Sequence, residues 1–469
     1  MKRCMRAMTA VTAAAMCAGA LCGCRVDQAA EVGAWRRVLD GEQPRAVSWT
    51  AGQPLTLEQA MELANAHNER LGLQGEAYLQ ALIAKDRAAA AFKPTIQLGG
   101  SYSIQNDTNI PGSQDYSAQL TASGGMNVFN GFSDLAAFRA AGQNALAKRA
   151  LLLDAQAAVL LDVARTYYEI VRSEKLVEVL TNSIAVQEER VRDIRARQAA
   201  GLARPLDVAQ TEAQASATRV SLIAARNVVA TGRATLSFLV GADVGDAPLT
   251  DNADVPGNVA TLSRMLELAA SCRQDLAAAR YGVQAAAQQI QAAVGRYYPS
   301  VSVNLSYFLY RDPSSPLDWT AALSANLPVF SAGLIEADVR AAWSALRQAQ
   351  LSESQTRRSV IQAVQTAYTN LQSSEKRLRE LRVQVEAAGE ALRQAEQSYR
   401  AGLATNLERL TAQDSLLSAQ LQLTSEMFNR KVYYLELLRA AGLLSMRLPQ
   451  EPATVPATAP ATQPATAQP

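Results

Sequence analysis

The sequence predicts a mixed α/β membrane protein in which one structural unit occurs twice. Two observations carry this prediction. The stretch AGLARPLDVAQTEAQ at residues 200–214 returns nearly unchanged as AGLATNLERLTAQDS at residues 401–415. Each half of the chain also has two segments in which polar and apolar residues alternate. These segments are roughly 11 residues long, the length that a tilted strand needs to cross a membrane.

Composition excludes several classes of function. The 45 Lys and Arg residues nearly balance the 43 Asp and Glu residues, and no basic stripe with interleaved aromatics supports nucleic-acid binding. The one histidine, His67, is too few for a His-based catalytic triad or a multi-His metal site. Because the sequence has no nucleophile-plus-base arrangement, phosphate loop or metal-ligand spacing, we expect no enzyme activity, no catalytic residue, no cofactor and no metal.

Residues 1–23 are typical of a lipoprotein signal peptide. A basic start precedes a short apolar run at residues 8–21, which is too short for a membrane-spanning anchor. The sequence LCGC at residues 21–24 resembles a bacterial lipobox, whose cysteine is lipidated and becomes the mature N-terminus. Cys24 is therefore the expected lipid attachment site, and residues 24–54 the lipid-anchored N-terminal segment. A plain secretory signal is the alternative.

An internal duplication predicts two structural repeats, residues 55–240 and 261–443. Residues 56–71 (TLEQAMELANAHNERL) align with residues 261–276 (TLSRMLELAASCRQDL) at an offset of 205, and the offset becomes 201 further along. A Gly-, Pro- and Asp-rich linker at residues 241–260 joins the repeats. Beyond them, residues 444–469 are rich in Pro, Ala and Thr and are expected to form a disordered tail.

Each repeat is expected to begin with a helix, followed by a β-hairpin at residues 95–128 in the first copy and 300–330 in the second. Their polar faces carry Ser, Thr, Asn, Gln and Gly with almost no charge. That composition suits a water-filled lumen opposite a lipid-facing apolar band. An ordinary soluble antiparallel sheet with one buried face would show the same alternation.

A very long helix follows each hairpin, at residues 133–199 and 334–400, each roughly 100 Å long at 1.5 Å per residue. Apolar positions step by three and four along both helices, as in coiled-coil seams. The positions are Leu160, Val163, Tyr167 and Ile170 in the first helix and Ile361, Val364, Tyr368 and Leu371 in the second. A second helix is expected at residues 205–240 in the first repeat and 405–442 in the second.

Gly201 and Gly402 are expected to end the long helices in the left-handed conformation and to form two equivalent helix-reversal tips. Four strands cannot close a membrane barrel, because the smallest barrels have about eight. Open strand edges are not tolerated in lipid, so strands in a membrane would require a dimer or a trimer.

The chain resembles the TolC family of bacterial outer-membrane efflux proteins, in its lipoprotein branch of RND-type efflux outer-membrane factors. The resemblance rests on the duplicated helix start, the alternating strands after Pro94 and Pro299, LPVFSAG at residues 327–333 and YRAGLATNLERLTAQ at residues 399–413. The chain departs from the family at residues 68–71 (NERL) and 273–276 (RQDL), where relatives often carry Asn-Pro or Arg-Pro. The absence of the proline removes only a local kink of the helix.

The resemblance implies a homotrimer whose four strands per chain form a 12-stranded transmembrane β-barrel, continued by a long periplasmic α-helical barrel. It also implies a location in the outer membrane, held by lipid, and docking to a periplasmic adaptor protein and an inner-membrane transporter. Substrates would then pass through the lumen without a chemical step. The alternatives are the channel of a type I protein secretion system and a lipid-anchored coiled-coil scaffold. The substrate is set mainly by the pump, so the sequence does not name it.

By the same resemblance, Asp207 and Glu408 match acids that line the periplasmic aperture, where a trimer would gather them into a ring that favours cations. Tyr399 and Arg400 match positions that tie the tips together in a closed state. At Thr411 some relatives carry a further acid. Acids in the first turn of a helix also complement its macrodipole, so a purely structural role for Asp207 and Glu408 is an equal alternative.

Overall fold

The computed structural model describes residues 28–40, 49–50, 52–106, 114–251, 255–256, 259–312 and 318–444. The predicted signal peptide, Cys24 and all but the first residue of the C-terminal tail lie outside these residues. The chain divides into two compact units: Met1–Pro44, Gly72–Leu153 and Gln274–Thr356 form the first, and Arg45–Leu71, Asp154–Arg273 and Arg357–Pro469 form the second. Because both predicted repeats contribute to both units, neither unit corresponds to a repeat.

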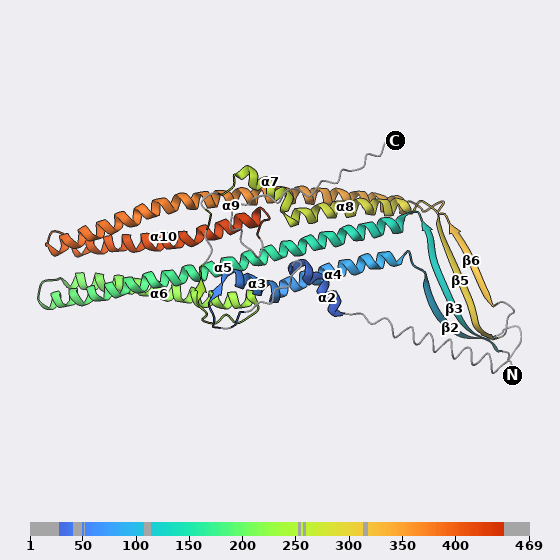
Figure 1. The fold of residues 1–469 in the computed structure, drawn as a ribbon, viewed down its shortest axis with the longest axis horizontal. Helices are drawn as coiled ribbons and strands as arrows, with labels where there is room; N and C mark the ends of the chain where they lie inside the picture. Colours follow the sequence, from blue (N-terminus) through green and yellow to red (C-terminus); the bar gives the residue numbers. More distant parts are fainter. Residues whose placement is uncertain are drawn as a thin grey trace. The chain divides into compact units, whose positions relative to one another are not determined.

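The first unit contains a four-stranded sheet and the helices next to it (Figure 1). Its elements are α2 (Gln28–Asp40), most of α4 (Glu69–Ala90), β2 (Thr95–Asn106), β3 (Gln114–Asn130), α8 (Gln274–Gly295), β5 (Ser300–Asp312), β6 (Trp319–Asn326) and the first parts of α5 (Ser133–Ala199) and α9 (Leu334–Arg400). The order of strands is β2-β3-β5-β6, with every pair antiparallel. The β3–β5 pair therefore joins the two halves of the sequence, and β2 and β6 are the edges.

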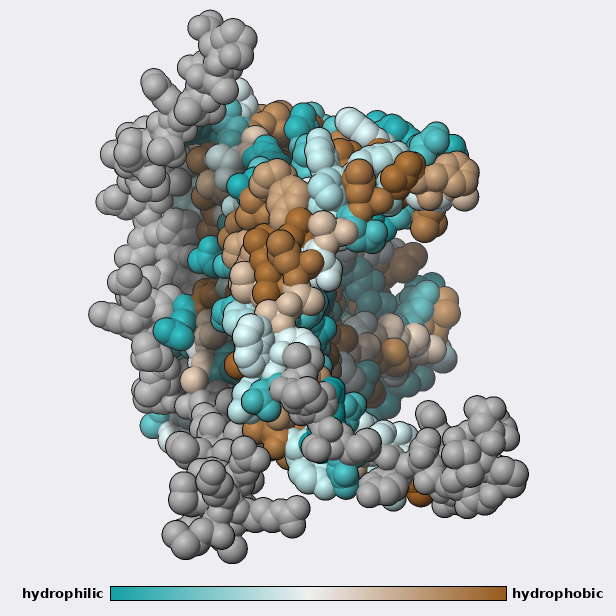
Figure 2. Space-filling model, turned by 90° about the vertical axis from the view of Figure 1, so that its right-hand side faces the viewer, coloured by the Kyte–Doolittle hydropathy of each residue, from teal (hydrophilic) through white to brown (hydrophobic). Residues whose placement is uncertain are grey.

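The register gives the sheet one apolar and one polar face. Residues directly opposite one another share a face. One such row consists of Leu98, Ala122, Tyr307 and Trp319, and the next row along the strands consists of Gln97, Ser123, Ser306 and Thr320. The apolar side chains are not covered by the chain itself, since Leu98 is 58% exposed and Leu323 is 74% exposed. Figure 2 views the molecule from the side on which Figure 1 shows the strands, and apolar and polar residues lie next to one another on this surface.

The strands end at other residues than the alternation predicts. In the first hairpin, β3 continues to Asn130, and in the second, β6 ends at Asn326 instead of continuing to residue 330. Pro328 lacks the backbone N–H that continued pairing would need. Val128 and Leu309 are extra residues at two bulges in the β3–β5 ladder, which breaks the alternation locally.

A pair of left-handed residues turns the chain from each hairpin into its long helix. The pairs are Gly131–Phe132, with φ of 57° and 62°, and Ala332–Gly333, with φ of 50° and 82°. A Cβ atom at Gly131 would lie 2.0 Å from the carbonyl oxygen of Gly295, so only glycine fits there. Ser133 then donates a 3.0 Å hydrogen bond to the carbonyl oxygen of Ala292, which fixes the start of α5 beside the end of α8.

The N-terminal segment predicted at residues 24–54 contains a helix that the sequence pattern did not reveal. Trp35 of α2 is only 3% exposed, and its indole N–H donates a 3.1 Å hydrogen bond to Glu76 of α4. Its ring covers Gly75, where an added Cβ would lie 2.3 Å from the ring. Helix α2 is thus packed against α4 in the first unit, so this part of the segment is more than a tether.

The second unit consists mainly of paired helices. It contains β1 (Leu55–Thr56), α3 (Leu57–His67), most of α5, α6 (Pro205–Val240), β4 (Leu249–Thr250), α7 (Leu262–Cys272), most of α9 and α10 (Asn406–Ala440). In Figure 1, α6 runs beside α5 and α10 beside α9. The helix predicted at residues 405–442 is shorter, because Thr405 caps its start and Gly442, with φ of 75°, follows its end.

The predicted linker at residues 241–260 also contains structure. Its strand β4 pairs in parallel with β1, and the buried Tyr167 hydroxyl lies 2.8 Å from the carbonyl oxygens of Leu55 and Thr250. Burial raises the pKa of Tyr167, which keeps this hydroxyl protonated as a donor. Strand β4 is therefore tied to β1 and to Tyr167 within the second unit.

The predicted apolar stripe is fully buried in α5, whereas in α9 only Val364 and Leu371 of the predicted stripe are buried. In α5, Leu160, Val163, Tyr167 and Ile170 are all within 1% of complete burial. In α9 the matching position Ile361 is 40% exposed, and the buried row is instead Val360, Val364, Ala367 and Leu371. None of the helices in the described part of the chain combines the length and apolar character needed to cross a membrane.

Candidate functional site

The two helix reversals have the same backbone. We call residues 200–211 the first tip and residues 399–413 the second tip. Gly201 and Gly402 adopt φ of 73° and 76°. The N–H of Leu202 donates to the carbonyl oxygen of Arg197, and that of Leu403 to Ser398, both at 2.8 Å. These bonds form the Schellman motif, in which a left-handed glycine satisfies the last carbonyl groups of a helix.

The first tip caps its second helix with an ion pair. Arg204, the residue before α6, donates from its backbone N–H to the Asp207 carboxylate at 3.2 Å and from its guanidinium at 2.9 Å. Asp207 is only 7% exposed, while Arg204 is exposed and covers it. The guanidinium holds the pKa of Asp207 below its ordinary value. The Asp207 charge is therefore neutralised within the first tip.

The second tip caps its helix without a cation. The Thr405 hydroxyl accepts a 3.2 Å hydrogen bond from the N–H of Glu408, and the Glu408 carboxylate accepts a 2.8 Å bond from the N–H of Thr405. This reciprocal pair is a capping box. Glu408 stays exposed, so its carboxylate faces solvent in this chain.

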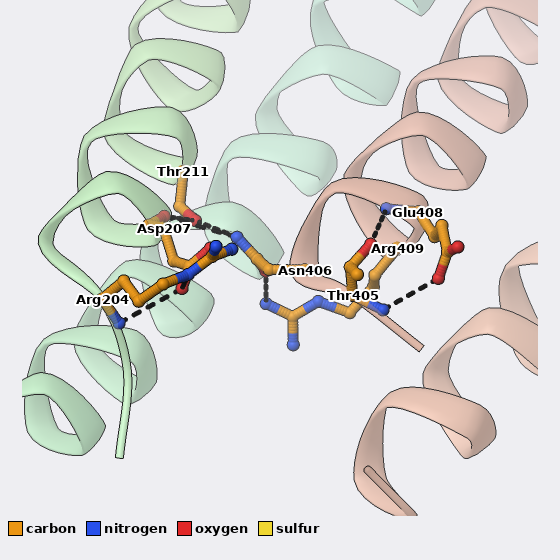
Figure 3. A network of polar contacts seen from close by, with 7 residues as sticks. All are labelled: Arg204, Asp207, Thr211, Thr405, Asn406, Glu408 and Arg409. Carbon is orange, nitrogen blue, oxygen red and sulfur yellow. Dashed lines mark hydrogen bonds and ion pairs between the residues drawn. The ribbon is translucent and has the colours of Figure 1, made fainter. Parts of the chain in front are cut away.

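Asn406 joins the second tip to the first (Figure 3). It is 4% exposed, and its side-chain amide donates to the carbonyl oxygen of Asp207 at 3.3 Å and to the Thr211 hydroxyl at 3.2 Å. The oxygen of the same amide accepts a 2.8 Å bond from the Arg409 guanidinium. The matching position in the first tip is Pro205, whose side chain has no donor or acceptor.

Arg409 extends this network to the end of α9. Its guanidinium lies 4.3 Å from the centre of the Tyr399 ring, and the Arg197 guanidinium from α5 lies 5.5 Å from the same ring. Arg409 is 6% exposed, and a cation–π contact is stronger when the cation is removed from water. The Tyr399 ring therefore contacts two cations, one from each repeat.

A second polar contact joins the repeats a few turns above the tips. Arg190 of α5 donates to the carboxylate of Glu396 in α9 and to the side-chain oxygen of Gln413 in α10. Burial lowers the pKa of Arg190, Glu396 raises it and Arg409 lowers it further. Arg190 thus connects three helices within the second unit.

The structure places the residues predicted for an aperture in different surroundings. Asp207 is buried and paired, Glu408 is exposed, Tyr399 is stacked, and Arg400 is the exposed last residue of α9. Thr411 donates to the carbonyl oxygen of Leu407 at 2.9 Å. The two acids therefore share a position in the repeat but not an environment.

Sequence reasoning missed the residues that connect the tips. Asn406 and Arg409 occupy the positions of Pro205 and Val208 in the other copy, and this mismatch between otherwise similar stretches was the available signal. Within the described residues, no cluster of three or more His, Cys, Asp or Glu side chains could hold a metal ion. The arrangement ties helices of the two repeats together, and it presents the Glu408 carboxylate to solvent.

Comparison with known proteins assigns the family. The profile described as outer membrane efflux protein matches residues 61–242 and again residues 265–443. The chain belongs to the outer membrane efflux protein family. This confirms the resemblance to the TolC family that the two repeats carry.

Individual relatives of the family are distant. The outer membrane efflux protein BepC of Brucella suis is 26% identical over 373 residues, which is 76% of this chain and 79% of BepC. The multidrug resistance outer membrane protein MdtP of Escherichia coli is 26% identical over 292 residues, 60% of this chain and 59% of MdtP. The crystal structure of the outer membrane protein VceC of Vibrio cholerae has a TM-score of 0.74 at 22% identity and covers 82% of this chain and 96% of VceC. That likeness shows a common fold.

Proposed function

We propose that this chain is the outer-membrane channel of a tripartite efflux system. Three copies contribute their sheets to a 12-stranded barrel, and their long helices continue it as a periplasmic tunnel. A lipid on Cys24 holds the N-terminus at the membrane. A periplasmic adaptor and an inner-membrane transporter deliver the substrate, which crosses without a chemical step. BepC and MdtP, named for efflux and multidrug resistance, support this assignment.

The exposed apolar face of the sheet carries the proposal. Large apolar side chains such as Ile96, Tyr102 and Leu323 are 84%, 67% and 74% exposed, so the chain itself does not bury this face. Its two edge strands, β2 and β6, have no further partner in the sheet. Lipid would cover the apolar face, and only closure with other copies would satisfy the edges. A soluble sheet would need one buried face.

A matched pair of substitutions on β6 tests which face meets lipid. Leu323 pairs with Val303 on the apolar face, and its neighbour Ser324 pairs with Ser302 on the polar face. An arginine facing lipid near the midplane costs about 2–4 kcal/mol. Leu323→Arg should therefore lower the amount of folded protein in the outer membrane, while Ser324→Arg should assemble normally and reduce the cation conductance of the pore. Equal tolerance of both variants would contradict the barrel.

The native mass of the detergent-extracted protein, corrected for bound detergent, tests the number of copies. A trimer supports the shared barrel. A stable folded monomer would mean that the four strands are not part of a barrel, and the lipid-anchored scaffold would become the better account.

We also propose that Glu408 lines the aperture and that Asp207 contributes less to it. Glu408 is exposed, whereas the Asp207 charge is covered by Arg204. Three Glu408 carboxylates would favour cations, and Tyr399 and Arg400 would hold the tips near one another. Glu408→Gln should lower cation selectivity in planar bilayers more than Asp207→Asn does. Equal losses of selectivity would mean that both acids line the aperture. Unchanged currents in both variants would mean that both acids serve only as helix caps.

A further inference from the structure

A cavity lies among three helices of the second unit, above the tips. It has a volume of about 460 Å³ and is lined by residues of α5, α9 and α10. Apolar walls come from residues such as Val186, Leu392 and Leu416, and polar groups include Arg190 and Gln413. The volume falls in the usual range for sites of drug-sized ligands, which have mostly apolar walls and a few polar groups.

Two buried arginines lie near this cavity. The Arg190 side chain is 14% exposed and contacts one carboxylate directly, that of Glu396, while Glu189 acts on it from further away. Arg409 is also close enough to act on Arg190, and its own partners are neutral, Asn406 and the Tyr399 ring. The Nε–H of Arg409 is a buried donor without a hydrogen-bond partner, which favours an additional acceptor such as an anion.

We propose that this cavity binds a small amphipathic organic anion, a carboxylate or sulfonate attached to an apolar body. The anionic group contacts Arg190 in place of Glu396, and the apolar body packs against the Val and Leu walls. The larger groove between α9 and α10, about 780 Å³, does not offer this chemistry, because the side chain of its Arg377 is 48% exposed and therefore screened by water, whereas that of Arg190 is 14% exposed. The binding site stands independently of channel activity.

Because the ligand and Glu396 compete for Arg190, two substitutions should change the affinity for the ligand in opposite directions. Arg190→Gln removes the cation that the ligand contacts, so affinity should fall about tenfold or more. Glu396→Gln removes the competing carboxylate and leaves Arg190 charged, so affinity should rise. Arg195→Gln is the matched control, since Arg195 is another α5 arginine whose partner, Glu212, is exposed and outside the cavity.

Isothermal titration calorimetry of the full chain in detergent with naphthalene-2-sulfonate tests these expectations. The neutral analogue 2-naphthalenemethanol shows whether the charge matters. We expect binding of the sulfonate with one site per chain, much weaker binding of the alcohol, loss in Arg190→Gln, gain in Glu396→Gln and no change in Arg195→Gln. Equal affinity for both probes, or equal effects at Arg190 and Arg195, would overturn the proposal.

A second variant distinguishes loss of the binding site from misfolding of the protein. Leu416→Trp fills the cavity while leaving every charged group in place, so it should abolish binding with an unchanged circular dichroism spectrum. Retained binding in a folded Leu416→Trp protein would place the ligand elsewhere and contradict the site.

Discussion

The two tips have one backbone and two chemistries. Both end a long helix with a left-handed glycine and start the next helix after three further residues. The first tip neutralises its acid internally through Arg204, whereas the second tip leaves Glu408 exposed and uses Asn406 and Arg409 to reach its neighbour. In this chain, the second tip therefore supplies the side-chain donor that joins the tips, that of Asn406. The first tip supplies the acceptors, the carbonyl oxygen of Asp207 and the hydroxyl of Thr211.

The largest effect on local stability should come from Asn406, whose side chain bonds from the second tip to the first. Asn406→Ala removes a buried amide that bonds to Asp207 and Thr211, and it leaves the Arg409 guanidinium without the oxygen that accepts its hydrogen bond, which should cost about 2 kcal/mol. Pro205→Ala is the matched change in the first tip and should cost less than about 1 kcal/mol. Hydrogen exchange at residues 200–211 and 399–413 would measure the free energy of local opening. Equal values would show that the tips are not asymmetric.

A somewhat smaller effect on local stability is expected for Tyr399, whose ring contacts Arg409 and Arg197. Tyr399→Leu should weaken the contacts with Arg409 and Arg197 and lower the local opening free energy by about 1–2 kcal/mol. Tyr399→Phe keeps the ring and should behave like the wild type. If Phe is as damaging as Leu, the hydroxyl of Tyr399 matters and the cation–π contacts do not.

Thr405, the N-cap of α10, should contribute less to local stability than Asn406 and Tyr399 do. Thr405→Ala removes the hydroxyl that accepts from the N–H of Glu408, and loss of such a cap costs about 1 kcal/mol. Thr405→Ser retains the hydroxyl and should restore stability. The measurement is exchange protection in the first turn of α10, and unchanged protection in Thr405→Ala would exclude a role for the cap.

The smallest effect concerns the pH dependence of the first tip. Arg204 holds the pKa of Asp207 below its ordinary value, so the pair stabilises the fold above that value and less as the pH falls. Wild-type protein should lose protection at the first tip between about pH 5 and pH 3. Asp207→Asn and Arg204→Gln should both remove this dependence, and a variant that keeps it would assign the titration to another group.

Local signals explain what could be predicted from the sequence. Gly201, Gly402 and Pro205 act on their immediate neighbours, so they indicate helix ends directly. The period-2 alternation revealed the hairpins because one face of the sheet is apolar throughout. It did not place strand ends, because the bulges at Val128 and Leu309 change the phase.

Contacts between distant residues explain what was missed. Asn406 meets Asp207 only after both repeats have folded, and Trp35 is buried only because Gly75 leaves room for it. The strands β1 and β4 have two residues each, too few for any periodicity. Ile361 looked like a core position in the repeat, but the buried row of α9 starts one residue earlier, at Val360.

The pairing of β3 with β5 has a consequence for biogenesis. Thr121 pairs with Phe308, so the middle of the sheet forms only after most of the chain has left the ribosome and crossed the inner membrane. Until then the first hairpin exposes an apolar face and the unpaired outer edge of β3, which makes such intermediates prone to aggregation. Long-range pairing of this kind also slows folding. A periplasmic holding factor that binds extended apolar segments would therefore be needed earlier, and for longer, by the first hairpin than by the second.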